Sequence, residues 1–355
     1  MATRDTSRIA AHMLEGRELP GGWQVVEKIE RGPDATGGYF SVGYIVVRDG
    51  GRGYLKALDY SIAFESGDAA RVLEWMTSSY NFEADLLDDC AASRMDRVVR
   101  ALDRGEISVE GAENVPNVSY LIFEEADGDI RSALDSIGAA FDYAWTCRML
   151  HHAATGLWQL HRADMAHQDV KPSNVLTFGR DLSKIGDLGR ASRRGSSAPH
   201  DEMEFAGDRH YAPPELLYGQ IAADWIARRH ACDVYLLGSL TMFVFSGATA
   251  TAAILSFLDD SQHPDDWDDT YAAVLPYVRV AFDRAIEEFE EALSEQLAAA
   301  VVPMVRQLCD PDPAIRGHPR TRAITGGNPY SLERYVSEFD LLARRAEIGM
   351  YRDAG

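Results

Sequence analysis

Four residues near the middle of the chain carry side chains that could act together in catalysis. Asp169, Lys171 and Asn174 share one short polar sequence, HQDVKPSN, and Asp187 follows thirteen residues after Asn174. A carboxylate can accept a proton, an ammonium group can offset negative charge, and carboxylate and amide oxygens are ligands that Mg²⁺ prefers. Asp and Asn are also common turn residues, so each of them alone would be better explained as part of a polar loop.

Three motifs in a fixed order are more informative than any single residue. HQDVKPSN at 167–174 follows a long helical pattern, KIGDLG lies at 184–189, and YAPPE lies at 211–215. In this order they resemble the catalytic loop, the metal-binding loop and the end of the activation segment of protein kinases. The chain is similar to a divergent serine/threonine kinase of the bacterial type, and the resemblance extends from about residue 20 to about residue 320.

The resemblance implies roles in phosphoryl transfer from ATP. Asp169 would accept or orient the proton of a substrate hydroxyl, and Lys171 would offset charge on the transferring phosphoryl group. Asn174 would supply a neutral oxygen to Mg²⁺, and Asp187 an anionic oxygen that bridges the metal and the nucleotide phosphates. ATP and Mg²⁺ are therefore the expected cofactors. A lysine at the offset of Lys171 favours serine and threonine over tyrosine as acceptors in this family.

A lysine that anchors the nucleotide is expected in the N-terminal part. GYLKAL at 53–58 resembles the third strand of protein kinases, where Lys56 would bind the α- and β-phosphates. Its carboxylate partner should lie on the helix that follows. Glu83 fits best because two leucines follow it one turn later, and Glu74 is the runner-up. A surface lysine and a surface glutamate are the alternative explanation.

A glycine-rich stretch, GPDATGGYFSVG, precedes this strand. Gly37 and Gly38 are expected to form the turn over the phosphates, since glycines let backbone N–H groups approach them closely. Ser41 stands where the third glycine of the family pattern would fall, so a plain hairpin turn remains the alternative.

The sequence YLIFEEA at 120–126 resembles the hinge of protein kinases. Phe123 would border the back of the adenine pocket. Backbone groups of Glu124 and Ala126 would pair with the adenine edge.

Three further residues have implied structural roles. Asp233 opens CDVYLLG, which resembles the start of the buried central helix of the large lobe. Arg316, in DPDPAIR, resembles the arginine that pairs with the glutamate of the activation segment, here Glu215. A buried helix also explains why residues 234–258 are uncharged, a length that could otherwise span a bilayer.

β-forming residues and Gly-rich turns fill the first third of the chain, and helical periodicity dominates afterwards. The expected class is α+β, a bilobal protein-kinase-like fold with a small antiparallel-sheet N-lobe containing one helix and a large helical C-lobe. The expected strands lie at 22–30, 39–49, 53–60, 97–107 and 118–126, and the long helices at 69–94 and 140–163. The expected parts are an N-terminal arm at 1–19, the N-lobe at 20–126, the C-lobe at 127–320 and a helical extension at 321–355.

The composition of the chain limits the kinds of partner and the cellular compartment that we expect. The 355 residues carry a net charge of −21, which disfavours nucleic-acid binding and is compatible with a basic protein partner. The four cysteines form no Cys-x-x-Cys pair, which is typical of a reduced, cytoplasmic protein without a zinc site. The charged N-terminus has no signal-peptide pattern, and we expect no membrane association.

The chain departs from the family pattern at several positions. Gln168 replaces an arginine that commonly contacts a phosphorylated activation loop, which predicts activity without that phosphate. Leu188 replaces the usual Phe, and Asp208 stands near the usual threonine, where it could select a basic substrate or mark a degraded peptide site. Candidate phosphorylation sites lie at Ser192, Ser196 and Ser197.

Three hypotheses follow. The first is an ATP- and Mg²⁺-dependent serine/threonine protein kinase that acts on a protein substrate. The second is a pseudokinase that binds nucleotide or serves as a scaffold, and the third is a small-molecule kinase. Since the sequence contains no sensor domain, a regulatory protein partner is expected.

Overall fold

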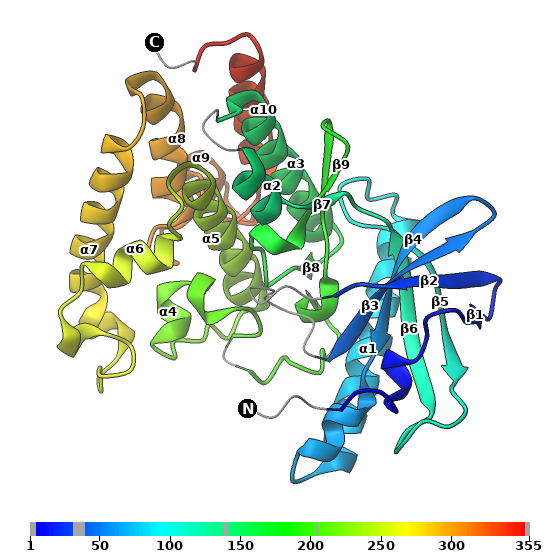
Figure 1. Ribbon diagram of the computed structural model, residues 1–355. Coiled ribbons are helices and arrows are strands. Elements are labelled where there is room, and N and C mark those ends of the chain that lie inside the picture. Colours follow the sequence, from blue (N-terminus) through cyan, green and yellow to red (C-terminus); the bar gives the residue numbers. More distant parts are fainter. Residues whose placement is uncertain (1–4, 31–39, 138–140, 204, 352–355) are drawn as a thin grey trace. The chain divides into compact units, whose positions relative to one another are not determined.

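A computed structural model describes residues 5–30, 40–137, 141–203 and 205–351 of the chain (Figure 1). The chain forms two compact units. The first comprises Met1–Arg94 and Val99–Asp127, and the second Met95–Val98 and Gly128–Gly355. The described part of the first unit is built around an antiparallel sheet, and that of the second is mainly helical. The α+β class predicted from the sequence is therefore confirmed.

Six antiparallel strands form the sheet of the N-terminal unit, in the order β1-β2-β3-β4-β6-β5. Side chains alternate along β4, where Leu55 and Ala57 are buried and Lys56 projects from the opposite face. The strands are β1 (Glu18–Leu19), β2 (Trp23–Lys28), β3 (Ser41–Arg48), β4 (Gly51–Leu58), β5 (Ala101–Ser108) and β6 (Asn117–Glu124).

The strand predicted at 97–107 begins later than expected, at Ala101. Met95–Val98 belong to the second unit instead, where Val98 forms an isolated bridge with Ile185. The segment predicted as one strand is thus divided between the two units, which sequence periodicity could not distinguish.

The segment that precedes residue 20 is packed into the N-terminal unit over its described residues. Ala10 and Ala11 of the short 3₁₀ helix η1 (Ala10–His12) are buried, as are Leu14 and Leu19. The hydroxyl of Tyr44 donates a hydrogen bond of 2.7 Å to the Ala11 carbonyl. The predicted N-terminal arm is therefore part of the core of this unit.

Helix α1 (Ala69–Ala92) is the one long helix in the described part of this unit, and it follows the 3₁₀ helix η2 (Tyr60–Glu65). Asp68 caps α1 by accepting a hydrogen bond of 3.2 Å from the backbone N–H of Arg71. The buried side of α1 is formed by Met76, Glu83, Ala84, Leu86, Leu87 and Cys90. Glu83 is the one charged member of this set.

The described part of the second unit is built from helices and two small sheets, one of three strands and one of two. The helices are α2 (Ile130–Ile137), α3 (Tyr143–Arg162), α4 (Pro214–Leu217), α5 (Trp225–Ser246), α6 (Ala250–Ser256), α7 (Tyr271–Glu291), α8 (Glu295–Leu308), α9 (Pro319–Arg322) and α10 (Glu333–Glu347). The strands are β7 (Gly128–Asp129), β8 (Met165–Ala166), β9 (Val175–Phe178), β10 (Leu182–Ile185) and β11 (Ser192–Arg193), paired as β10-β9-β7 and β11-β8. The 3₁₀ helices are η3 (Pro172–Asn174), η4 (Leu188–Arg190), η5 (Arg209–Tyr211) and η6 (Asp260–Gln262).

Helix α5 lies in the main core of the second unit. Its buried residues run almost without a break from Arg229 to Val244, and it ends at Gly247, whose φ of 78° is readily adopted by glycine. Among the described residues, no single helix has the length and hydropathy of a membrane span, whereas α5 and α6 satisfy those criteria together with a bend of 78° between them.

Helix α10 packs against α3, as Figure 1 shows. Arg148 of α3 donates hydrogen bonds to Asp340 at 2.8 Å and to Glu347 at 2.7 Å, and His151 contacts the Val336 carbonyl at 3.1 Å. The amphipathic C-terminal segment is thereby attached to the helical unit.

Candidate active site

The loop with Asp169, Lys171 and Asn174 connects β8 to β9 in the second unit. The hairpin of β9 and β10 then reverses the chain, with Val175 opposite Ile185. This pairing continues just beyond the strands, where the Gly186 N–H donates a hydrogen bond of 2.8 Å to the Asn174 carbonyl. The hairpin therefore brings Asp187 back to the loop from which the chain departed.

Asp233 of α5 holds the start of this loop. Its carboxylate accepts hydrogen bonds from the backbone N–H groups of His167 at 2.7 Å and Gln168 at 2.8 Å, and from the His161 ring at 2.9 Å. Burial opposes ionisation of this fully buried group. The hydrogen bond and charge of His161 and the hydrogen bond from Gln168 outweigh burial and lower the pKa of Asp233. A stable buried anion thus positions the backbone that precedes Asp169.

Asp169 lies at the centre of the loop and is 7% exposed. Its Oδ2 accepts a hydrogen bond of 3.0 Å from the Asn174 amide and lies 3.0 Å from Lys171 Nζ. Its Oδ1 accepts a hydrogen bond of 3.0 Å from the Asp208 N–H. Burial and the negative charge of Asp187 raise the pKa of Asp169, against the opposing effect of Lys171. Such a carboxylate is well suited to accept a proton.

The donor set formed by Asn174 and Asp187 fits a magnesium ion. The Asn174 side-chain nitrogen donates to the Asp169 carbonyl at 2.8 Å and to its carboxylate at 3.0 Å, which directs the amide oxygen away from Asp169. Asp187 is near enough to affect the Asp169 pKa. Mg²⁺ usually takes one or two protein oxygens and completes its shell with phosphates and water. Among the described residues, no group of three or more His, Cys, Asp or Glu side chains could hold a metal ion. The described part of this region therefore does not form a metal site from protein ligands alone.

The backbone at Asp187 has a φ of 56°, and at Gln168 a φ of 69°. Non-glycine residues rarely adopt the left-handed region, and such conformations are concentrated at functional sites. Leu188, which directly follows Asp187, is buried, so an apolar contact is kept where the family pattern has Phe.

In the N-terminal unit, Lys56 of β4 contacts Glu83 of α1. Lys56 Nζ donates to both carboxylate oxygens of Glu83, at 3.0 and 2.9 Å. The Glu83 side chain is 7% exposed and the Lys56 side chain 22%. Glu74, the runner-up, is exposed. The structure therefore pairs Lys56 with the glutamate that the sequence favoured.

The other residues predicted to contact the nucleotide belong to the glycine-rich stretch and to the hinge sequence. Gly37 and Gly38 lie outside the described residues. Phe123 and Glu124 end strand β6, and Ala126 follows it. The Glu124 N–H donates to the Arg100 carbonyl at 3.1 Å and its carboxylate accepts from the Arg100 N–H at 2.8 Å, so these polar groups of Glu124 are used within the unit.

Glu215 and Arg316 meet in the core of the second unit. The two terminal nitrogens of Arg316 donate to the two carboxylate oxygens at 2.6 and 2.7 Å. Arg316 also donates to the carbonyls of Asp310 at 2.9 Å and Ala231 at 3.2 Å. This ion pair ties the segment that ends at Glu215 to helix α5 and to the loop before α9.

Asp208 lies beside the catalytic loop, as its sequence position indicated. Its carboxylate is 3.8 Å from Lys171 Nζ and 2.9 Å from the His210 ring. Burial opposes ionisation, but hydrogen bonds from His210 and the charge of Lys171 lower the pKa of Asp208. A second carboxylate therefore shares Lys171 with Asp169.

Sequence reasoning missed Arg229. This residue is 2% exposed and donates a hydrogen bond of 3.0 Å to the side-chain oxygen of Gln168. Arg229 lies beside Arg228, and no local spacing in the sequence links the pair to Gln168. The signal that could have identified it is an arginine next to the long apolar run of α5, where burial of charge requires a partner.

Similarity to known proteins identifies the family of this chain. The family model of the protein kinase domain matches residues 75–318, and the chain belongs to the protein kinase family. It is 30% identical over 129 residues to cyclin-dependent kinase-like 2 of Homo sapiens, covering 36% of this chain and 25% of that protein. It is 22% identical over 281 residues to serine/threonine-protein kinase ICK of Rattus norvegicus, covering 77% of this chain and 43% of that protein. With serine/threonine-protein kinase MAK of Homo sapiens it shares 22% identity over 236 residues, covering 64% of this chain and 36% of that protein. The matches span less than half the length of each of these relatives.

Proposed function

We propose that this protein is a serine/threonine protein kinase that transfers the γ-phosphoryl group of ATP to a hydroxyl of a protein substrate. The observation that carries the proposal is the arrangement of Asp169, which receives hydrogen bonds from Asn174 and Asp208 and lies 3.0 Å from Lys171. A carboxylate with a raised pKa beside a lysine can take a proton while the neighbouring cation stabilises transferred negative charge.

In the proposed reaction, Asp169 orients the acceptor hydroxyl and takes its proton. The hydroxyl oxygen forms a bond to the γ-phosphorus as the bond from that phosphorus to the β,γ-bridging oxygen breaks, and ADP leaves. Lys171 offsets charge on the phosphoryl group, and Lys56, oriented by Glu83, binds the α- and β-phosphates. Mg²⁺ bound by Asn174 and Asp187 would supply positive charge against the phosphates.

Serine/threonine specificity is part of the proposal and rests on Lys171 and on the relatives, two of which are named serine/threonine-protein kinases. The closeness of Asp208 to Lys171 supports the alternative, a pseudokinase, because a second carboxylate competes for the charge that the phosphoryl group would need.

The test is transfer of radiolabelled phosphate from ATP in the presence of Mg²⁺ to a generic acceptor protein or to the chain itself. We expect transfer by the natural protein and none by Lys56→Met or Asp187→Asn. Asp181→Asn is the matched control, since it makes the same chemical change at an exposed turn between β9 and β10 and should retain activity.

A melting curve with and without ATP separates the two functions. If the natural protein transfers no label while ATP still raises its melting temperature, the protein is a nucleotide-binding pseudokinase. Phosphoamino-acid analysis of a labelled product then tests the acceptor, and label on tyrosine alone would contradict the serine/threonine assignment.

A further inference from the structure

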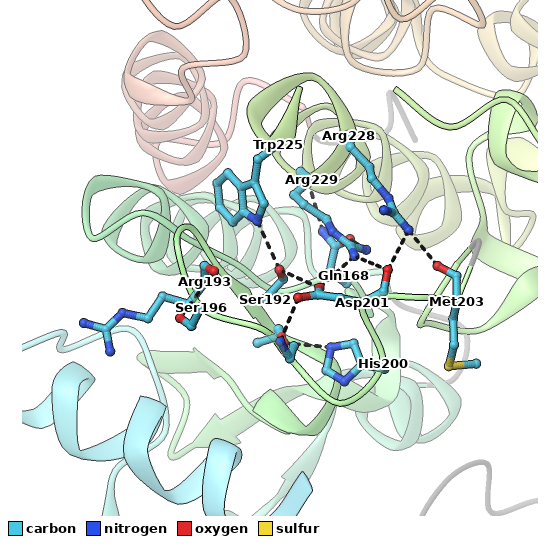
Figure 2. A network of polar contacts seen from close by, with 12 residues as sticks. Gln168, Ser192, Arg193, Ser196, His200, Asp201, Met203, Trp225, Arg228 and Arg229 are labelled. Carbon is cyan, nitrogen blue, oxygen red and sulfur yellow. Dashed lines mark hydrogen bonds and ion pairs between the residues drawn. The ribbon is translucent and has the colours of Figure 1, made fainter. Parts of the chain in front are cut away.

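The carboxylate of Asp201 contacts both ends of the segment that follows η4 (Figure 2). Asp201 Oδ1 accepts a hydrogen bond of 3.1 Å from the Ser192 hydroxyl, and Oδ2 accepts one of 2.7 Å from the Ala198 N–H. The same carboxylate forms an ion pair of 2.8 Å with Arg229 Nη2 of α5. Asp201 thus joins the two ends of the segment 192–201 to each other and to the central helix.

Arg229 joins this carboxylate to the catalytic loop. Its Nη1 donates to the Gln168 side-chain oxygen at 3.0 Å, and the Gln168 side-chain nitrogen donates to the Arg229 carbonyl at 3.0 Å. Gln168 directly precedes Asp169 in the chain. We call Gln168, Ser192, Asp201 and Arg229 the anchoring network.

Charge and burial explain why the network needs Asp201. The Arg229 side chain is 2% exposed, and a buried guanidinium is costly without an anion. Gln168 accepts a hydrogen bond from Arg229 through its side-chain oxygen, but it is neutral and cannot offset the charge. Within the anchoring network, the carboxylate of Asp201 is the group that neutralises Arg229.

Arg228, the neighbouring residue on α5, adds to the attachment. Its Nη2 donates to the backbone carbonyls of Asp201 at 3.0 Å and Met203 at 2.7 Å (Figure 2). Both guanidinium groups therefore contact the same short stretch of chain. Arg229 donates to the carboxylate and the carbonyl of Asp201, and Arg228 donates to backbone carbonyls alone.

We propose that Asp201 and Arg229 are positioning residues that hold the segment 192–203 and the catalytic loop in place with a charge encoded in the sequence, so that no phosphate group is required. The consequence for catalysis rests on the proposed kinase function. The structural part of the proposal, that the charge of Asp201 orders the segment, is independent of the kinase function.

The serines of the segment agree with this assignment. Ser192 is fully buried and its hydroxyl also accepts a hydrogen bond of 3.2 Å from the Trp225 ring nitrogen, so it is inaccessible while the segment is folded. Ser196 and Ser197 are exposed, and Ser196 Oγ contacts the Arg193 carbonyl at 3.5 Å. Phosphate at these two positions would therefore lie on the surface turn and not in the anchoring network.

The test compares Asp201→Asn with Glu202→Gln, which removes the same charge from an exposed neighbouring position. Hydrogen exchange followed by mass spectrometry on peptides covering 191–203 should show exchange at least about 10-fold faster in Asp201→Asn, because a charge-assisted attachment is lost. Exchange in Glu202→Gln should match the natural protein. Equal protection in Asp201→Asn and the natural protein would overturn the proposal.

If Asp201→Asn does not fold, the pair Asp201→Glu and Asp201→Gln replaces it, since the two side chains have nearly the same size and differ in charge. Asp201→Glu should be better protected than Asp201→Gln, and the reverse order would also overturn the proposal. Phosphatase treatment of the natural protein should leave protection unchanged, whereas a loss of protection would show that phosphate holds the segment.

Kinetics then test the catalytic consequence. Asp201→Asn should raise KM for the acceptor protein more than it changes KM for ATP. The substitution loosens the attachment of the loop that carries Asp169, which is proposed to orient the acceptor, while Lys56 is unchanged. If the natural protein transfers no phosphate but the exchange difference between it and Asp201→Asn persists, the proposed function fails and the anchoring role stands. If both KM values are unchanged in an active enzyme, Asp201 is not a positioning residue.

Discussion

Arg316 and Glu215 form a two-pronged ion pair in the core of the helical unit, although 101 residues separate them in the chain. Burial disfavours the charged form of Arg316. The charge of Glu215 and its hydrogen bonds outweigh the effect of burial and raise the pKa of the guanidinium. With 0% exposure for the Arg316 side chain and 7% for Glu215, neither charge can be hydrated if the other is lost.

Removing one partner of this pair should therefore be strongly destabilising. We expect Glu215→Gln to lower the free energy of unfolding by about 3–5 kcal/mol, because it leaves a buried, unneutralised arginine. Urea unfolding measures the effect. The exposed pair Arg306–Asp283 is the control, and Asp283→Asn should cost about 1 kcal/mol or less. Similar losses in both variants would contradict the assignment of Glu215 and Arg316 as a buried anchor.

The Lys56–Glu83 contact leads to a second prediction. If Glu83 orients Lys56 for ATP, Glu83→Gln should lower kcat/KM for ATP about 10- to 100-fold, which is the effect of weakening a hydrogen bond between charged groups. Glu74→Gln makes the same change at an exposed position of the same helix and should have little effect. Steady-state kinetics at varied ATP concentration distinguish them. An equal loss in both variants would mean that the helix as a whole is perturbed.

The raised pKa of Asp169 predicts a pH effect on activity. Burial and the charge of Asp187 favour the protonated acid, so the acidic limb of the kcat/KM profile should have its midpoint above the ordinary value of 3.8. Lys171→Met should move this midpoint further upward, because the lysine favours the ionised form. A limb that moves downward in this variant would contradict the proposed contact between the two side chains.

The same shift predicts an effect on stability that does not depend on activity. Because the folded state holds the Asp169 proton more tightly than the unfolded state, protonation contributes stability that is present at low pH and lost as the pH rises through the folded pKa. Relative to Asp169→Asn, the natural protein should therefore gain stability as the pH is lowered. Unfolding curves of both proteins at several pH values measure this difference, and Asp181→Asn serves as a surface control.

Gly156 of α3 gives a packing prediction. A methyl group added there would lie 2.6 Å from the Arg97 carbonyl oxygen and 2.8 Å from Ile185 Cγ1. The Arg97 carbonyl is already fixed by a hydrogen bond of 2.9 Å from the Ile185 N–H. Gly156→Ala should therefore destabilise the protein by about 1–3 kcal/mol in thermal or urea unfolding. Gly67→Ala, where a methyl group would meet nothing within 4 Å, should be close to neutral.

Much of the fold and of the catalytic loop could be predicted because their signals are local. Alternating residues define a strand such as β4, and helical periodicity defines α3, without reference to the rest of the chain. Asp169, Lys171 and Asn174 lie within six residues of one another, so their sequence already places their side chains in one neighbourhood. Segments with mixed periodicity were harder to assign from the sequence. The late start of β5 and the packing of the first described residues are two examples.

Other relationships depended on how distant elements pack. Glu74 and Glu83 lie nine residues apart on α1, about two and a half turns, so they face nearly opposite sides and only packing against the sheet determines which one meets Lys56. Arg229 and Asp201 are 28 residues apart, and Gln168 is 61 residues from Arg229. Residue type and local spacing were sufficient to indicate the chemistry of the loop. The partners of buried charges followed from tertiary packing, because a charge removed from water is stabilised by whichever group the fold brings next to it.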